Sequence, residues 1–310
     1  MNGFTTPRTK TCPRGPRITR GASSLLMAPA LLLSGCFLPT HRKLPIPIAP
    51  AVVQTATPQE LAKQINQRCD AIHSLSATVE MQASVTKGGV ESGYPSIGGI
   101  ILMRKPKDLR VYGRAPVVGT RILDMVSDGE SFKLWIPHEN EVIEGPAKES
   151  KTKSQNQFEN LRPGFFFDAL AVRCLAKDDE FYVTADTDTT EDAAKKRLML
   201  EPEYLLNVVH REENSQELAP VRVIHFHRDD LLPYQQDLYD AEGNLETQVY
   251  FGRYVDFGDH KYPSTITIKR PLDGLQLVLT IEKVTENLDL KNDSFQLPQI
   301  PPDTKLKRLQ

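Results

Sequence analysis

The residues of this chain that could bind a metal ion lie close together in its second half. His225, His227 and Asp229 alternate along a predicted strand, so two imidazoles and a carboxylate could project from one face and bind zinc. Their apolar neighbours Ile224 and Phe226 are equally typical of an ordinary half-buried strand, whose outer face is commonly polar. We favour the second interpretation and predict neither a metal site nor a cofactor.

Common catalytic motifs are absent from the sequence. It contains no Gly-x-Ser-x-Gly elbow, phosphate-binding loop, Cys-x-x-Cys pair or His-Glu-x-x-His helix. We therefore predict no catalytic residues and a protein that is not an enzyme.

Cys36 carries the strongest signal for covalent chemistry. Residues 1–35 contain five basic side chains, no acidic ones and an apolar run from Ala22 to Leu33, as in a secretory signal. The run is shorter than the roughly 20 helical residues needed to span a membrane. Leu33-Ser34-Gly35-Cys36 resembles the bacterial lipobox, which implies cleavage before Cys36 and acylation of that residue. An ordinary signal peptide that happens to contain a cysteine is the alternative.

Lipidation would decide where the protein resides. Two or more acyl chains hold a protein on a membrane, whereas one chain binds only marginally. Phe37 follows the cysteine in place of the aspartate that retains lipoproteins at the inner membrane, so we expect the periplasmic face of the outer membrane. Without the five leader cations, 33 basic and 40 acidic side chains remain, a formal net charge of −7. With no basic block, nucleic acid is not an expected partner.

The organisation after the leader follows from composition and periodicity. Residues 36–57 are rich in proline and predict an extended tether. A helix is predicted from Pro58, with Thr57 as N-cap and Glu60 completing a capping box. Strands with short turns follow, so we predict one mainly β (α+β) domain over 58–297 with a large antiparallel sheet and a flexible tail over 298–310. The expected strands include 97–104, 108–114, 120–127, 130–136, 141–145, 180–184, 197–201, 204–211 and 275–285.

Two cysteines remain in the predicted domain. Cys69 and Cys174 could pair in an oxidising envelope, or both could be small buried hydrophobic residues. The sequence leaves these alternatives open.

Four segments together resemble a known family. They read LSA at 75–77, GIILMRKP at 99–106, LRV at 109–111 and DMVSDGESFKLW at 124–135. This pattern is similar to the LolA/LolB superfamily, the periplasmic carrier and outer-membrane receptor of lipoprotein sorting. The resemblance implies an unclosed β-barrel, a half-barrel, whose helices plug the concave side and enclose an apolar cavity for acyl chains.

The resemblance also suggests where lipid would be contacted. The apolar positions that could line the cavity are Met81, Leu102, Tyr112, Leu123, Met125, Phe132, Leu134, Phe166 and Leu170. Pro116, Val117 and Val118 match the protruding apolar loop of the receptor, although valines replace its leucine. The valines could instead fold back onto the sheet.

Two functions remain in competition at this level. The first is an outer-membrane lipoprotein that binds acyl chains, such as palmitate, for lipoprotein localisation or lipid transfer. Its partners would be the membrane through Cys36, acyl chains or lipoproteins, and a periplasmic carrier protein. The second is a non-enzymatic envelope scaffold or stress-sensing module that binds a protein. A void large enough for an acyl chain favours the first, and a filled core favours the second.

Overall fold

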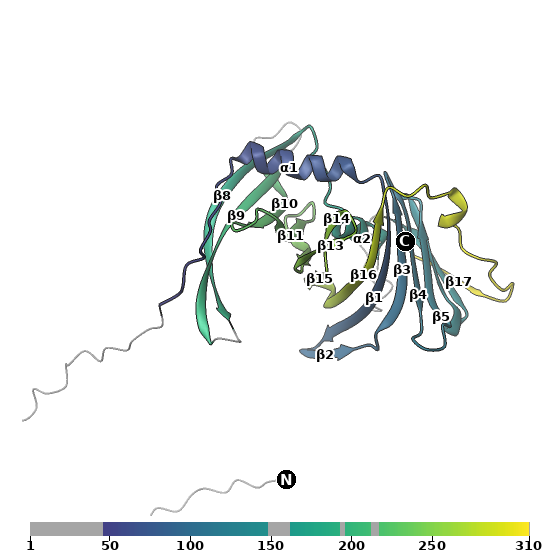
Figure 1. Cartoon of the computed structure of the whole chain (residues 1–310). Helices are drawn as coiled ribbons and strands as arrows, with labels where there is room; N and C mark the ends of the chain where they lie inside the picture. Colours follow the sequence, from purple (N-terminus) through teal and green to yellow (C-terminus); the bar gives the residue numbers. More distant parts are fainter. Residues whose placement is uncertain (1–45, 148–161, 193–195, 212–216, 310) are drawn as a thin grey trace, which may run out of the picture. The chain divides into compact units, whose positions relative to one another are not determined.

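The computed structural model describes residues 46–147, 162–192, 196–211 and 217–309, and the chain from Ile46 onward forms one compact unit. Its main feature is a 15-stranded sheet in the order β17-β7-β6-β5-β4-β3-β1-β16-β15-β12-β11-β10-β9-β8, with β2 paired to β1. Neighbouring strands are antiparallel except β17 and β7, and the edge strands β8 and β17 do not pair with each other (Figure 1). The predicted fold class, mainly β with a large unclosed sheet, is confirmed.

Over the described residues, the unit contains two α-helices, seventeen strands and three short 3-10 helices. The helices are α1 (Pro58–Ala71) and α2 (Pro163–Leu170). The strands of the first half are β1 (Ser74–Lys87), β2 (Val90–Gly93), β3 (Ile97–Arg104), β4 (Asp108–Arg114), β5 (Arg121–Ser127), β6 (Ser131–Ile136) and β7 (Glu141–Pro146). Those of the second half are β8 (Asp179–Asp192), β9 (Arg197–Arg211), β10 (Leu218–His227), β11 (Pro233–Tyr239), β12 (Leu245–Phe251), β13 (Tyr254–Phe257), β14 (His260–Pro263), β15 (Thr265–Arg270), β16 (Leu275–Glu286) and β17 (Lys305–Arg308).

Helix α1 begins as its sequence predicts. The Thr57 hydroxyl accepts a hydrogen bond from the Glu60 N–H, and the Glu60 carboxylate accepts one from the Thr57 N–H at 2.7 Å. The Thr57 N–H and the Thr57 hydroxyl both donate to the Glu60 carboxylate and hold the pKa of Glu60 below its ordinary value. Leu61, Ile65 and Cys69 recur at helical spacing and are all buried. Local capping and one apolar stripe thus determine both the start and the orientation of this helix.

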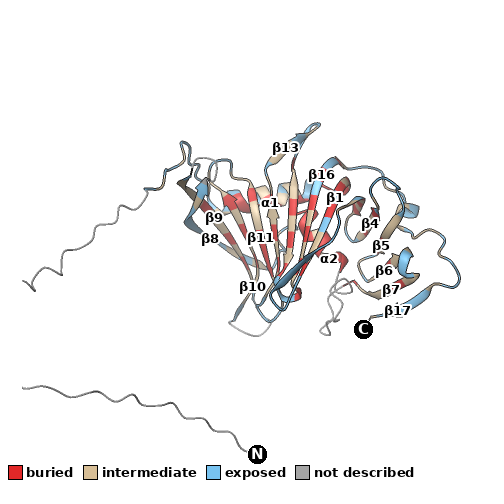
Figure 2. Ribbon diagram, turned by 90° about the horizontal axis from the view of Figure 1, so that it is seen from below, coloured by how far each residue is buried: buried red, intermediate tan, exposed pale blue. Residues whose placement is uncertain are grey.

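A single hydrophobic core lies on one face of the sheet. Buried side chains alternate with less buried ones along the strands, as Figure 2 shows, because successive residues of a strand point to opposite faces. Helices α1 and α2 pack on the core face, where Leu61 and Ile65 of α1 join Phe165 and Phe166 of α2. The first strand, β1, pairs with β16 near the end of the chain, so the core draws on both halves of the sequence.

The segment before α1 is bound to the body. Ile48 donates to the Leu198 carbonyl at 2.9 Å and accepts from the Leu200 N–H at 2.8 Å, and the Gln54 N–H donates to the Arg228 carbonyl at 2.6 Å. The first half of β9 extends beyond β10, which leaves its backbone groups open to this pairing. Within the extended tether predicted over 36–57, Ile48 and Gln54 are thus bonded to the body, while residues 36–45 lie outside the described part.

The C-terminal segment is also part of the fold. Residues 305–308 form β17, which pairs in parallel with β7, and the Leu309 N–H donates to the Glu144 carbonyl at 2.8 Å. Arg104 and Arg110 donate to the carbonyls of Leu290 and Ser294 and so fix the preceding chain. The prediction of a flexible tail over 298–310 is thus wrong, because an unpaired β7 edge offers backbone partners that composition does not reveal.

Strands β8 and β9 run further than predicted. Residues 186–192, which lie beyond the predicted strand 180–184, continue β8 as the partner of the first half of β9. The Thr187 and Thr189 N–H groups donate to the carboxylates of Asp186 and Asp188, each at 2.7 Å. These acids therefore occupy backbone donors of an edge strand.

Among the described residues, neither helix is long and apolar enough to cross a bilayer.

Candidate functional site

An open cavity of about 1160 Å³ lies beside α2. Pro163, Phe165, Phe167 and Ala171 give it an apolar wall, and the turn that follows β3 together with the start of β12 provides much of the remainder. Pockets that bury small ligands typically enclose about 300–1,000 Å³. The cavity is therefore large enough to hold part of an amphiphilic molecule.

Basic and acidic side chains also line this cavity, and most of them are paired. Arg173 forms an ion pair with buried Asp168, and burial raises the pKa of Asp168 although Arg173 opposes this. Arg270 contacts Asp273 at 2.7 Å. The charges that flank α2 thus mostly neutralise each other.

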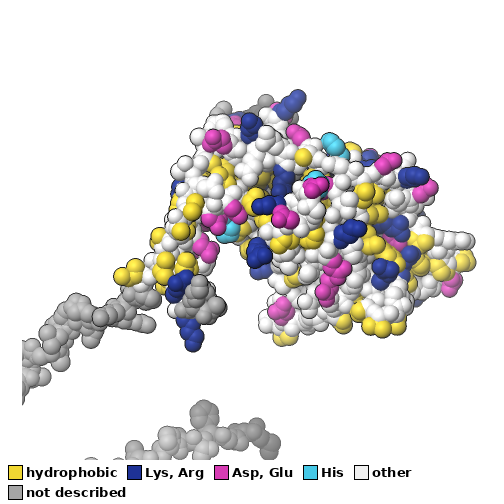
Figure 3. Space-filling model, viewed as in Figure 1, with side chains coloured by type: hydrophobic (Ala, Val, Ile, Leu, Met, Phe, Trp, Pro, Cys, Tyr) yellow, Lys and Arg dark blue, Asp and Glu magenta, His cyan; other side chains and the backbone are white. Residues whose placement is uncertain are grey.

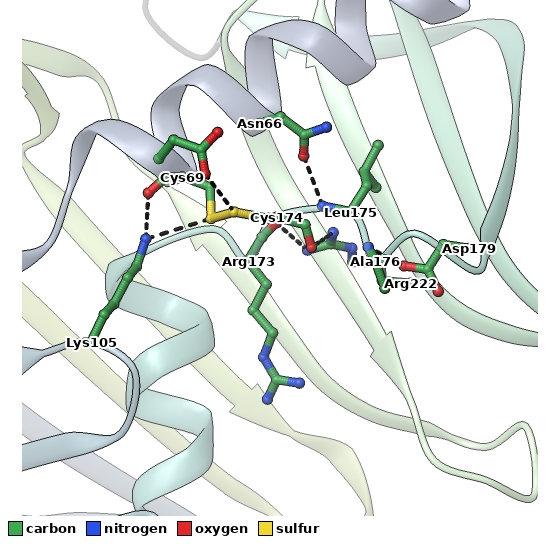
Figure 4. Close-up of a disulfide and its surroundings, with 10 residues drawn as sticks. Asn66, Cys69, Lys105, Arg173, Cys174, Leu175, Ala176, Asp179 and Arg222 are labelled. Carbon is green, nitrogen blue, oxygen red and sulfur yellow. Dashed lines mark hydrogen bonds between the residues drawn. A yellow bond between two sulfur atoms is a disulfide. The ribbon is translucent and has the colours of Figure 1, made fainter.

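A disulfide between Cys69 and Cys174 forms one rim of the cavity (Figure 4). It joins the last turn of α1 to the segment that follows α2, across 105 residues of sequence. The Lys105 ammonium donates to the Cys69 carbonyl, and the Asn66 amide oxygen accepts from the Leu175 N–H at 2.8 Å. Of the two alternatives that the sequence left open for these cysteines, the structure contains the disulfide.

Arg222 of β10 also binds the segment that follows α2. Its guanidinium donates to the carbonyls of Arg173 and Cys174 at 2.9 and 3.0 Å, and burial lowers its pKa to about 10. The Tyr262 hydroxyl likewise donates to the Leu170 carbonyl at 2.7 Å. The end of α2 is therefore held by side chains from distant strands as well as by the disulfide.

The nine residues predicted to line an acyl-chain cavity do not line the cavity beside α2. Seven of them face the core, where the two helices and the opposing strands fill the space: Met81, Leu123, Met125, Phe132, Leu134, Phe166 and Leu170. Of the three consecutive phenylalanines, Phe165 and Phe166 are buried in this core and Phe167 is half-buried. The expectation that these nine positions share one open cavity therefore needs correction, because helix packing decides which apolar faces stay accessible.

Leu102 and Tyr112 lie on the opposite face of the sheet. Their neighbours along the strands, Met103 and Val111, are buried in the core, and alternation directs Leu102 and Tyr112 away from it. On that face, Arg121 lies 4.8 Å from the Tyr112 ring centroid and 3.3 Å from buried Asp124. The sequence could not determine which face of the sheet these two side chains occupy, because a one-residue change of register moves every side chain to the other face.

The loop between β4 and β5 exposes its valines. The Val117 side chain is fully exposed and Val118 is mostly exposed, which disagrees with valines folded back on the sheet. The Val118 N–H donates to the Pro116 carbonyl at 2.8 Å, and Val117 has a φ of +70°. This is the hydrogen bond of a γ-turn, with the strained sign of φ for a β-branched residue. Neither packing nor side-chain bonding offsets that strain in the described structure.

His225 lies between two carboxylates on the polar face of the sheet. Its Nδ1 is 3.0 Å from Glu203 and its Nε2 is 3.4 Å from Asp237. Burial of the imidazole lowers its pKa, but the bonds to Asp237 and Glu203 outweigh burial and raise the pKa of His225 above its ordinary value. Within the described ranges, the acidic, histidine and cysteine side chains close enough to share a metal ion are Cys69, Asp70 and Cys174, two of which form the disulfide.

Sequence reasoning missed the polar attachments of α2. Arg222 lies 49 residues from Arg173 in sequence, and its proximity to the segment after α2 has no local signal. The sequence marked only the place where this helix starts, at Arg162-Pro163-Gly164, and that start carries a basic residue.

On the face seen in Figure 3, basic and acidic side chains are interspersed with apolar ones.

An unclosed antiparallel sheet with two helices on one face defines the fold class of this protein. Solved structures similar to it include a LolA superfamily protein of Nitrosomonas europaea, with 13% identity over 78% of this chain and 99% of the other, at a TM-score of 0.48. A DUF1329 family protein of Desulfovibrio piger has 14% identity over 77% and 95% of the two chains, at a TM-score of 0.47. A domain described as an outer membrane lipoprotein-sorting protein of Vibrio parahaemolyticus has 12% identity over 76% and 94%, also at 0.47.

No protein-family model matches the sequence, and no curated protein matches it.

Proposed function

We propose that this protein is a lipid-anchored protein of the outer membrane, facing the periplasm, that binds acyl chains of lipoproteins or other lipids without catalysing a reaction. Residues 1–35 would be removed and Cys36 would carry the anchor. The observation that carries the proposal is the cavity of about 1160 Å³, whose apolar wall is formed by α2. Its role would be lipoprotein localisation or lipid transfer, with a periplasmic carrier protein as a further partner.

The energy for such binding would come from apolar area. Each Å² removed from water contributes about 25 cal/mol, so a few hundred Å² of acyl chain contribute several kcal/mol before the costs of association. Phe167 and Ala171 present side chains of this kind at the cavity. The exposed valines of the β4–β5 loop supply a second apolar contact, suited to a bilayer surface or to an emerging chain.

A second function is favoured by a different observation. Helices α1 and α2 fill the core face, and β8 is a long edge strand with largely exposed side chains. An envelope scaffold or stress-sensing module could use such an edge to bind an extended segment of another protein. The Asp186 and Asp188 carboxylates, which occupy backbone N–H groups of that edge, weigh against this alternative.

Two experiments test the proposal. Cells that express wild type or Cys36→Ser are labelled with an alkyne fatty acid, and we expect label on wild type only; equal label on both refutes the anchor. The Cys36→Ser chain is then titrated with a fluorescent fatty acid. We expect Phe167→Glu to weaken binding while Tyr182→Glu, at an exposed aromatic outside the cavity lining, leaves it unchanged. Absence of binding to the Cys36→Ser chain favours the scaffold.

A further inference from the structure

The start of α2 places at the cavity a buried positive charge that forms no ion pair with a described residue. Arg162 is the N-cap residue of α2, is only 5% exposed and lines the cavity. Its Nη1 has no hydrogen-bond partner, and no ion pair joins its guanidinium to another described residue. The Phe132 ring lies 5.2 Å from its guanidinium carbon, and Asp273, which already pairs with Arg270, attracts it without forming an ion pair. A charge removed from water normally has a partner, since its desolvation is otherwise uncompensated.

The N-terminal end of a helix is also an unfavourable position for a positive charge. The N-terminus of an α-helix is the positive end of its dipole, so a guanidinium there is repelled and an anion is attracted. No side chain caps this helix start, and Pro163 at its first position has no N–H to donate. A Cβ added at Gly164 would meet no atom within 4 Å, so space is open beside the backbone at the second position. Phosphate groups commonly bind at helix starts of this kind.

The other charges of the cavity are already occupied. Lys107 pairs with Glu130, Arg270 with Asp273 and Arg173 with Asp168. Of the remaining acids, Asp240 accepts the N–H groups of Glu242 and Asn244 in its own turn, and Glu246 lies 4.0 Å from Arg270. Lys105, a further cation of the cavity lining, has no ion pair but donates to the Cys69 carbonyl. Among the described cations that line the cavity, Arg162 is therefore the one whose buried guanidinium keeps a nitrogen without a hydrogen-bond partner.

We propose that the start of α2 binds the phosphate group of a lipid. Arg162 would donate to two phosphate oxygens, in the geometry that guanidinium groups favour, and the start of the helix would contribute its dipole. The acyl chains would lie against Phe165 and Phe167, which line the same cavity next to the helix start. This inference deepens the proposed lipid-binding function and rests on it, since it specifies a phospholipid rather than an uncharged lipid.

Calorimetric titration of the Cys36→Ser chain tests the proposal with three probes. Dihexanoyl phosphatidic acid carries both chains and phosphate, dihexanoylglycerol carries the chains alone, and glycerol 3-phosphate carries the phosphate alone. We expect phosphatidic acid to bind at least about tenfold more tightly than either other probe. Arg162→Gln should remove this preference and leave binding of dihexanoylglycerol unchanged. Lys107→Gln, which removes a paired cation from the same cavity lining, should keep it.

The thermal midpoint separates ligand binding from a structural role. Because Arg162 has no ion pair, Arg162→Gln should not lower the midpoint without lipid, whereas a structural role would lower it. If Arg162→Gln does lower the midpoint, Arg162→Lys is tested in its place, because lysine keeps the charge but not the bidentate geometry. We then expect Arg162→Lys to lose at least part of the preference for phosphatidic acid.

Four other results would contradict the inference, and they distinguish failure of the phosphate site from failure of lipid binding. Equal binding of phosphatidic acid and dihexanoylglycerol to wild type, or a preference that survives in both Arg162 variants, refutes the phosphate site while lipid binding stands. Glycerol 3-phosphate that binds as tightly as phosphatidic acid refutes its assignment to a lipid. If neither lipid binds, the proposed function itself fails, and this inference with it.

Discussion

Removal of the disulfide should destabilise this protein substantially. Cys69 and Cys174 are 105 residues apart, and a cross-link that closes a loop of about 100 residues lowers the entropy of the unfolded chain by an amount equivalent to about 4.7 kcal/mol. Disulfides often deliver less than this, typically about 2–4 kcal/mol. We expect the variant Cys69→Ala/Cys174→Ser to lose about 3–4 kcal/mol of unfolding free energy. Alanine suits the helical position, and serine suits the exposed one.

Urea denaturation of wild type and variant, each with and without dithiothreitol, measures this loss. Oxidised wild type should unfold at the highest urea concentration, and reduced wild type should fall to about the level of the variant. The variant is its own control, because dithiothreitol should not change its midpoint. A variant within about 1 kcal/mol of oxidised wild type would refute the reasoning and mean that Arg222 and Asn66 hold the segment after α2 without the cross-link.

Three further changes test local parts of the structure. Thr57→Ala should cost about 1 kcal/mol by removing the N-cap of α1, and an unchanged denaturation midpoint would mean that the cap contributes nothing. Val117→Glu with Val118→Glu should leave the thermal midpoint nearly unchanged and reduce flotation with liposomes; a lowered midpoint contradicts the exposed loop, and unchanged flotation contradicts its role. The raised folded-state pKa of His225 means that its stabilisation is present below its unfolded pKa of about 6.5 and is lost as pH rises through the folded value. Wild-type stability should therefore fall over that range more steeply than that of His225→Gln, and parallel pH profiles would contradict this.

The sequence by itself determined the elements whose causes are local. Thr57, Pro58 and Glu60 predicted the start of α1 because a capping box involves residues three positions apart. Alternation and turn residues predicted β3 and β4 with their observed bounds and β5, β6 and β7 to within one residue, but they did not predict β2. The antiparallel sheet followed from the short turns between them, and its unclosed form was implied by the resemblance to the LolA/LolB superfamily.

Only the tertiary structure decided how these elements meet. The pairing of Cys69 with Cys174 depends on where α1 and the end of α2 lie, which neither segment encodes alone. The register that directs Leu102 and Tyr112 away from the core is set by strand partners. The attachment of the segments before α1 and after β16 depends on which strand edges remain open. That Arg162 forms no ion pair with a described acid depends on which acids other residues have already engaged. Capping and alternation act over a few bonds, whereas these contacts join groups that become neighbours only once the chain has folded.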